Sequence, residues 1–277
     1  MYDKSRLKLK NPWIAAVLAF LVPGAGHFYQ RRMFKAGIYS VCILGTFFGG
    51  MALGDWQTCY YRKDAKHTHY GYISQFMVGI PALPALVQAK RYRENVVLDA
   101  IPLQNESLSG IEFEGIYRSQ GQAMTEGVPI RGSLNGQVAR VDTESFGAEL
   151  HNAEFIGIRT DNGEEFGLTL EGPPQIGHPI SPSPDRMFSC QVVNKEGLPV
   201  GYVDGSIPRN FWNWYQMPLQ ESNLEHLHGT LGKRFDLALV FTWIAGLLNV
   251  LAIWDALEGP AYGIGDEPEP EPESDKD

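Results

Sequence analysis

Residues Leu237–Trp254 read LALVFTWIAGLLNVLAIW, eighteen positions without a charge and with Asn249 as the only strongly polar member. A helix rises about 1.5 Å per residue, so this stretch is long enough to cross a hydrocarbon layer of roughly 30 Å. Three further runs also lack charged residues, namely 11–30, 36–54 and 70–89. Helices buried in water-soluble proteins rarely stay uncharged for so long. The four runs therefore predict an integral membrane protein.

Two of these runs are interrupted. Run 11–30 contains Pro23–Gly26 in its middle, and run 70–89 contains two prolines in its second half. Proline removes an amide donor and glycine is flexible, so a continuous helix is not expected through Pro23–Gly26. Run 11–30 is expected to be either a kinked span or a re-entrant hairpin with both ends on one face of the membrane.

Lysines and arginines beside the runs favour one of these topologies. If all four runs cross, these residues divide into seven on one face and eight on the other. If run 11–30 only dips, twelve lie on one face and three on the other. The positive-inside rule then favours three spans, a cytoplasmic middle region and a tail that leaves on the far side. A first helix that crosses from outside would also leave the middle region cytoplasmic.

Charge is segregated along the chain, which has a net charge of -9. Residues 1–99 carry a net +8, residues 100–234 a net -8 and residues 235–277 a net -9. This balance excludes a uniformly basic nucleic-acid binder, and it makes anionic lipid head groups the expected counter-charge of the basic segments. Three cysteines are too few for a disulfide framework, and free thiols favour a reducing compartment for the middle region.

The middle region has the pattern of a β-domain. Residues 100–232 contain short stretches in which apolar and polar residues alternate, separated by turn signals such as Asn135-Gly136. Alternation with such turns predicts hairpins in a small barrel or sandwich. The proline-rich residues 172–185 are expected to be a long loop. The aromatic stretch 211–215 is typical of a head-group interface or of domain packing, and a ligand-stacking platform is the alternative.

These patterns predict an α+β membrane protein. It would consist of a bundle of three to four transmembrane or re-entrant helices with an inserted small all-β domain. The expected organisation is a membrane region 1–93, a linker 94–110, a soluble β-rich domain 111–220, a linker 221–236, a C-terminal transmembrane helix 237–256 and a disordered acidic tail 257–277.

The two ends of the chain resemble a known family. Residues 23–32 read PGAGHFYQRR after an apolar helix and before a glycine-led second run, and residues 245–255 read AGLLNVLAIWD. Both stretches resemble the two-transmembrane-helix domain family, in which an aromatic–Asp pair closes the second helix. The whole chain looks most like an uncharacterised bacterial membrane protein family of that kind. The resemblance implies a bacterial inner-membrane location and helix pairing, and it implies no reaction.

A set of residues carries the turn and the helix pairing in this resemblance. They are Pro23, Gly24, Gly26, His27, Phe28, Tyr29, Arg31, Arg32, Gly37, Asn249, Trp254 and Asp255. Arg31 and Arg32 are expected to anchor the turn at the head groups, with binding of a lipid phosphate as the alternative. Asn249 and Asp255 are expected to face the bundle.

Two His-x-His pairs are the only candidates for a metal site, His67 with His69 and His226 with His228. In an extended chain, residues i and i+2 share a face, so each pair could offer two imidazoles to a metal. Exposed loop histidines are the more ordinary interpretation. We expect no catalytic residue and no cofactor.

The function expected from the sequence is that of a non-enzymatic envelope scaffold or adaptor that presents its β-domain at the cytoplasmic face. Its expected partners are the lipid bilayer and other membrane proteins or a second copy of the chain, and no nucleic acid. The alternative is a membrane-embedded enzyme, or a lipid- or metal-binding protein that uses the basic turn and the His-x-His pairs.

Overall fold

The computed structural model describes residues 10–63, 69–94, 106–121, 127–141 and 147–259. The chain forms two compact units. Residues 1–90 and 216–277 make up a helical unit, and residues 91–215 make up a β unit. Much of the predicted linker 94–110 and nearly all of the predicted tail 257–277 lie outside the described residues.

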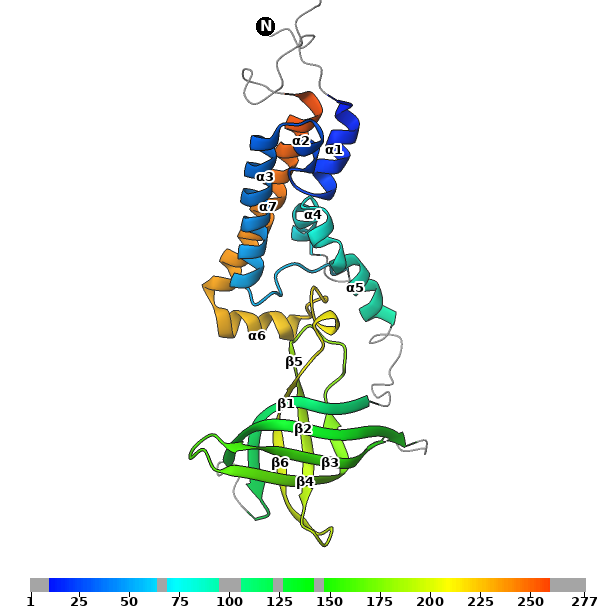
Figure 1. Ribbon diagram of the computed structural model, residues 1–277, viewed down its shortest axis with the longest axis vertical. Coiled ribbons are helices and arrows are strands. Elements are labelled where there is room, and N and C mark those ends of the chain that lie inside the picture. Colours follow the sequence, from blue (N-terminus) through cyan, green and yellow to red (C-terminus); the bar gives the residue numbers. More distant parts are fainter. Residues whose placement is uncertain (1–9, 64–68, 95–105, 122–126, 142–146, 260–277) are drawn as a thin grey trace, which may run out of the picture. The chain divides into compact units, whose positions relative to one another are not determined.

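The helical elements are shown in Figure 1. They are α1 (Pro12–Leu21), α2 (Ala25–Tyr29), α3 (Met33–Leu53), α4 (Gly71–Phe76), the 3-10 helix η2 (Ile80–Ala82), α5 (Pro84–Tyr92), α6 (Glu221–Leu231) and α7 (Lys233–Glu258). Among the described residues, α3 and α7 are the helices long and apolar enough to cross a membrane.

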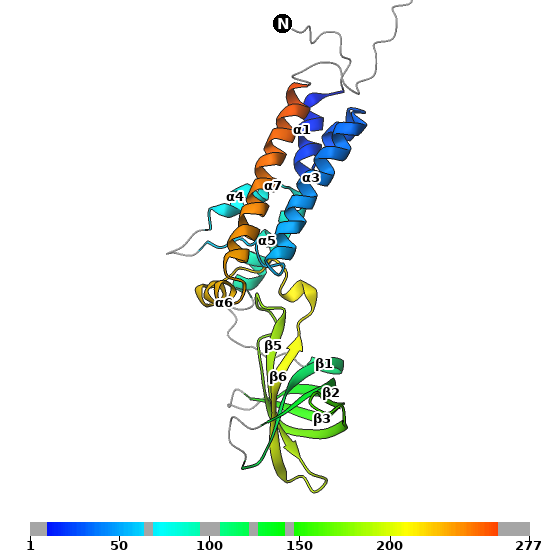
Figure 2. The same cartoon turned by 90° about the vertical axis from the view of Figure 1, so that its left-hand side faces the viewer.

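Helices α3 and α7 lie side by side and run antiparallel (Figure 2). At one end, Arg234 at the start of α7 donates from Nε to the carbonyl of Leu53 at 2.9 Å. At the other end, Arg32, which precedes α3, forms an ion pair with Asp255 near the end of α7. The predicted runs 36–54 and 237–254 thus form one helical pair.

The first run forms a helical hairpin. Asn11 caps α1 by accepting from the backbone N–H of Trp13 at 3.0 Å. Helix α1 ends at Leu21, and a short non-helical segment precedes the start of α2 at Ala25. The two ends of the hairpin lie together, because Lys10 Nζ is 4.8 Å from the centre of the Tyr29 ring. With ten residues, α1 is about 15 Å long and too short to cross a bilayer. The structure therefore has the hairpin, which is one of the two forms expected for run 11–30.

The expectation of a span over 70–89 is wrong, because no continuous helix covers these residues. They divide into α4, η2 and the start of α5. Gly79 has a φ of +85°, and a Cβ there would lie 2.0 Å from the carbonyl oxygen of Phe20. Two prolines follow within five residues, and each removes a backbone donor. The charge argument for a cytoplasmic β-domain required this third span, so it no longer holds.

The segment 221–236, expected to be a linker, is helical. It forms α6 and the first turn of α7. The backbone N–H of Gln220 donates to Asn223 Oδ1 at 3.2 Å, which completes a capping box. Leu227 is buried with Leu219 and Phe235, so α6 packs against its own unit. The sequence signal was weak because α6 is largely polar.

The β unit is a closed antiparallel barrel of six strands in the order β1-β2-β3-β4-β5-β6, with β6 pairing back to β1. The strands are β1 (Glu106–Ser119), β2 (Val128–Val141), β3 (Gly147–Arg159), β4 (Glu165–Ile176), β5 (Asp185–Val193) and β6 (Pro199–Pro208). The predicted all-β domain is thus a barrel rather than a sandwich. Its first strand begins at Glu106, earlier than the predicted boundary at residue 111.

Alternating side chains fill the barrel interior. Phe113 from β1 lies at the centre, with its ring 5.6 Å from that of Phe155 and 5.9 Å from that of Phe188. Strand β4 extends into the proline-rich stretch that we expected to be a loop. The β4–β5 register shifts between Glu171 and Gln175, and such an irregularity accommodates prolines that lack a ladder donor.

Cys190 on β5 reports on the integrity of the barrel. Its thiol is buried, and burial raises its pKa to about 11. In a variant with the other cysteines replaced by Ala, alkylation at pH 8 is expected to be at least about 100-fold slower in the folded chain than in urea. The folded rate should rise about tenfold per pH unit between 8 and 10, because the thiolate fraction does. Equal rates with and without urea would contradict the buried position.

Candidate functional site

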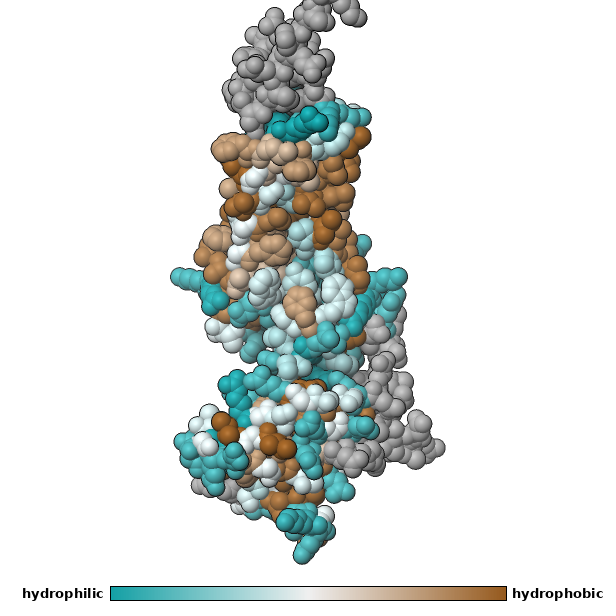
Figure 3. All heavy atoms as spheres, in the orientation of Figure 1, coloured by the Kyte–Doolittle hydropathy of each residue, from teal (hydrophilic) through white to brown (hydrophobic). Residues whose placement is uncertain are grey.

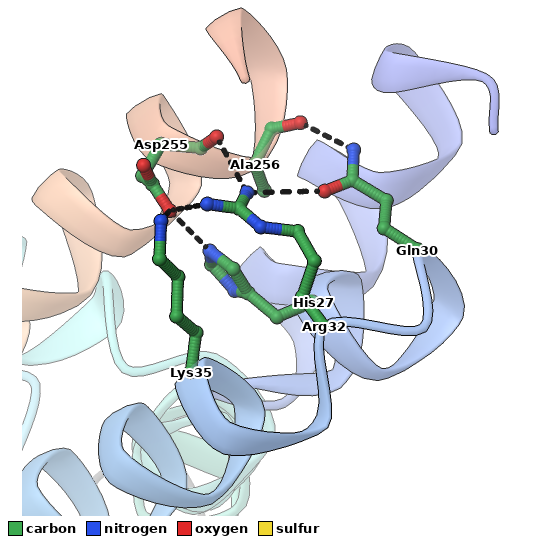
Figure 4. Close-up of polar contacts among 6 residues, drawn as sticks. All are labelled: His27, Gln30, Arg32, Lys35, Asp255 and Ala256. Atoms are coloured by element: carbon green, nitrogen blue, oxygen red, sulfur yellow. Dashed lines mark hydrogen bonds and ion pairs between the residues drawn. The ribbon is translucent and has the colours of Figure 1, made fainter. Parts of the chain in front are cut away.

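The site with the densest polar chemistry lies where the first hairpin meets the end of α7 (Figure 4). Asp255 stands in the last turn of α7. The C-terminal end of a helix carries partial negative charge, so a carboxylate there is unfavourable unless cations surround it. The turn after α2 and the first turn of α3 supply these cations.

Three basic side chains converge on one carboxylate oxygen. Asp255 Oδ2 lies 2.8 Å from His27 Nε2, 2.9 Å from Arg32 Nη2 and 3.9 Å from Lys35 Nζ. His27 and Arg32 are fully buried, whereas Asp255 and Lys35 are partly exposed. An ionised carboxylate only accepts hydrogen bonds, so the proton of this contact lies on His27 Nε2.

The same turn also caps the backbone of α7. Gln30 donates from Nε2 to the carbonyl of Ala256 at 2.8 Å, and Arg32 donates from Nη1 to the carbonyl of Asp255 at 3.3 Å. The last four carbonyls of a helix lack partners within the helix. Here side chains from more than 220 positions earlier in the sequence supply donors to two of them. The arrangement locks the hairpin to the end of α7.

The two arginines of the turn have different roles. Arg31 is exposed and has a φ of +67°, so the chain reverses at this residue between α2 and α3. Arg32 is buried on Asp255. The expectation that both arginines face head groups is therefore wrong for Arg32, because the carboxylate occupies its guanidinium. Arg31 is free of that constraint.

Other residues of the predicted turn shape the hairpin. Gly26 packs so closely on α1 that a Cβ would lie 2.1 Å from the carbonyl oxygen of Ala15. Ser40 of α3 donates from Oγ to the carbonyl of Pro23 at 2.8 Å, so the segment between α1 and α2 is hydrogen-bonded to α3. Gly24 is buried there, while Phe28 and Trp254 are exposed.

Gly37 does not pair helices. A Cβ at this position would meet nothing within 4 Å. The close approach of α3 to α7 occurs at Gly50 instead, where a Cβ would lie 2.9 Å from the carbonyl oxygen of Ala238. Small residues on the outer face of α3 look the same in the sequence as those that touch α7.

Asn249 joins three segments of the helical unit. It is fully buried and donates from Nδ2 to the carbonyl of Ala19 at 3.1 Å and to that of Met77 at 2.7 Å. It therefore faces the interior of the bundle and fixes both α1 and the end of α4 against α7.

A neighbouring polar contact was not expected. Gln75 of α4 is fully buried and donates from Nε2 to Thr242 Oγ1 and to the carbonyl of Thr58, each at 2.8 Å. Thr242 and Asn249 are seven residues apart, so they share one face of α7. That spacing, together with a glutamine in an uncharged run, is the signal that could have revealed this seam.

Replacing Asn249 by Ala is expected to lower the free energy of unfolding by about 1 kcal/mol, because two interhelical hydrogen bonds are lost. Thermal unfolding of the purified chain in detergent measures this effect. The adjacent Leu248→Ala is the control, since Leu248 lies on the exposed side of α7. Equal destabilisation by both substitutions would show that the contacts of Asn249 do not matter.

The histidines that the structure describes do not converge on a metal site. Among the described residues, no group of three or more His, Cys, Asp and Glu side chains could hold a metal ion. His67 lies outside these residues, and His69 Nδ1 donates to the carbonyl of Tyr60 at 3.0 Å. His226 and His228 lie exposed on α6. In a helix, residues two apart are rotated by about 200° around the helix axis, so these two side chains lie on nearly opposite faces. The expectation of a shared face required an extended chain.

Sequence comparison places the chain in a family. The model of the "Family of unknown function (DUF6677)" matches residues 14–267. The chain belongs to this family. The match includes the hairpin turn, the barrel and Asp255, so both halves of the candidate site lie within it. It says nothing of a two-transmembrane-helix domain, and that resemblance stays a prediction. No curated protein and no solved structure matches the chain.

Proposed function

We propose that the chain is an integral membrane scaffold or adaptor. In this proposal α3 and α7 cross the bilayer as a pair, and the α1–α2 hairpin dips into it from the side of the chain termini. The barrel, which is part of the segment between α3 and α7, lies on the opposite side, where it is presented to a partner. In the same segment, α4 packs against the middle of α7 and stays with the helices of the membrane region. The proposal makes no use of a cofactor or a reaction.

The exposure of apolar side chains on α3 and α7 carries the proposal. An apolar helix in the core of a water-soluble protein is mostly buried. Here only 28% of an 18-residue apolar stretch of α3 is buried, and 33% of the corresponding stretch of α7. Val41, Leu247 and Leu251 are 73%, 60% and 64% exposed. In Figure 3, brown apolar residues are concentrated on the upper part of the helical unit. Large apolar side chains exposed along two neighbouring helices are unfavourable in water and are typical of a lipid contact.

Aromatic residues support the same placement. Trp13 and Trp254 are both exposed near the end of the unit where Asp255 lies, and Trp56 is exposed near the other end. Tryptophan is enriched at both interfaces of a bilayer. With two crossings, seven lysines and arginines flank the terminal side and eight flank the barrel side, so these residues favour neither orientation over the other.

The barrel supports a role in presentation rather than enclosure. Most of its interior is filled by an apolar cluster that includes Phe113, Phe155 and Phe188. A packed interior leaves the outer surface and the ends for recognition. The alternative of a lipid or metal binder built on the turn and the histidines is less well supported, because Arg32 is engaged by Asp255 and the described histidines do not converge.

Membrane extraction with a matched pair of variants tests the proposal. The unmodified chain should stay in the membrane pellet after an alkaline carbonate wash. Replacing Leu247 and Leu251 by Lys should release it or prevent its insertion, because each charge at the centre of a span opposes insertion by about 3 kcal/mol. Making the same change at Ile156 and Met187 of the barrel, which are 62% and 59% exposed, should leave it in the pellet. Recovery of the unmodified chain in the supernatant of a detergent-free lysate would overturn the proposal.

A further inference from the structure

One end of the barrel interior holds a buried arginine. Arg186 on β5 has the same inward orientation as Phe188 and Cys190, and its side chain is 3% exposed. It pairs in register with Ile207 of β6, which is fully buried. Arginine is rarely fully buried unless its charge is matched. Its presence inside an apolar barrel therefore calls for a partner.

The partner that the chain provides is incomplete. Arg186 donates from Nη2 to Glu106 Oε1 at the start of β1. Its Nε and Nη1 are also buried, and neither has a hydrogen-bond partner among the residues that the structure describes. A buried donor without an acceptor is unfavourable, and the loss is larger for a charged group. The geometry therefore leaves N–H groups that need an oxygen acceptor.

A second guanidinium group adds positive charge at this end of the barrel. Arg209, just after β6, donates to the carbonyls of His178, Ser183 and Asp185, which holds it in place. Burial, and then the charge of Arg186, lowers its pKa to about 10, while the exposed carboxylate of Asp185 opposes this shift. The Arg209 guanidinium therefore stays charged at neutral pH. Glu106 is the only carboxylate that pairs directly with Arg186 in the described part of the chain.

We propose that Arg186 and Arg209 form a binding site for a small oxyanion at the end of the barrel. The ligand class is a phosphate or carboxylate group, whose oxygens accept the free N–H groups of Arg186 while the charge of Arg209 stabilises the anion. Arginine suits such groups because its donors are fixed in a plane and stay charged. Glu106 opposes binding of the anion, because its carboxylate pairs with Nη2 of the same guanidinium and repels a second negative charge.

Phosphate titration of the full chain in detergent tests this site, with binding followed by ³¹P NMR at constant ionic strength. Inorganic phosphate is expected to bind, with acetate as the carboxylate arm and chloride as the control anion. Glycerol 3-phosphate, a phosphomonoester, tests whether the site accepts the phosphate group of a larger molecule. Binding equal to that of inorganic phosphate indicates an open site for such groups. Binding of inorganic phosphate alone indicates a closed site for the free ion. Arg186→Gln should abolish binding, and the exposed Arg131→Gln should not change it.

Glu106→Gln separates binding from folding. The amide still accepts from Arg186, but the competing negative charge is gone, so phosphate affinity is expected to rise about five- to tenfold. A damaged fold cannot produce such a gain. Phosphate and acetate that bind no better than chloride would overturn the proposal, as would a Glu106→Gln variant whose affinity is unchanged or weaker.

Discussion

Replacing Asp255 by Asn is expected to lower the free energy of unfolding of the helical unit by about 3–5 kcal/mol. The substitution keeps the shape of the side chain but removes the charge that Arg32 contacts at 2.9 Å. Arg32 is fully buried, and a buried charge that loses its partner is strongly destabilising. Lys35 and His27 lose the same acceptor charge, so every contact that the hairpin and α3 make to the carboxylate of Asp255 is weakened.

Asp236→Asn is the matched control, because Asp236 is the other aspartate of α7 and is well exposed. It is expected to change stability by less than about 1 kcal/mol. Tryptophan fluorescence during thermal unfolding in detergent measures both variants. If Asp255→Asn were no worse than Asp236→Asn, the contacts around Asp255 would be incidental rather than a lock.

Replacing Gly246 by Ala should be the second most damaging change, with a loss of about 3 kcal/mol. A Cβ at Gly246 would lie 1.7 Å from the carbonyl oxygen of Ser74, far inside a normal contact distance. Ser74 also donates from Oγ to the carbonyl of Trp243, so α4 and α7 approach each other closely at this point. Overpacking at such a site forces the two segments apart.

Gly45→Ala provides the matched control for Gly246→Ala. Gly45 lies in α3, and a Cβ there would meet nothing within 4 Å. Alanine stabilises a helix relative to glycine by about 0.5–1 kcal/mol, so this variant is expected to be neutral or slightly more stable. The difference in melting temperature between the two variants isolates the contact. A similar response from both would contradict the close packing of α4 on α7.

The long helices and the β-domain could be predicted from the sequence because each depends on local pattern. The uncharged runs predict the ends of α3 and α7 to within a few residues. The alternation of apolar and polar residues, together with the turn signals, predicts the strands. Run 70–89 misled the prediction, because absence of charge does not distinguish a span from short helices broken at Gly79 and two prolines. The polar face of α6 hid a helix whose burial depends on Leu227.

The candidate site could be predicted only in part. His27, Arg32 and Asp255 were singled out by the resemblance, but nothing in the sequence pairs residues that lie 223 positions apart. The adjacent arginines of the turn look equivalent in the sequence, and only the reversal of the chain at Arg31 buries one and exposes the other. Arg186 was missed because a single arginine in a short strand pattern gives no sign of facing inward.

Site-specific labelling on either side of α7 shows whether a bilayer separates the barrel from the chain termini. With the three native cysteines replaced by Ala, single cysteines are introduced at Glu196, in the turn before β6, and at Glu258, at the end of α7; both positions are accessible from solvent. In sealed membrane vesicles of one orientation, a membrane-impermeant maleimide should label only one of the two positions, and it should label both after permeabilisation. Labelling of both positions to the same extent before permeabilisation would contradict a chain whose barrel and terminal end are separated by a bilayer.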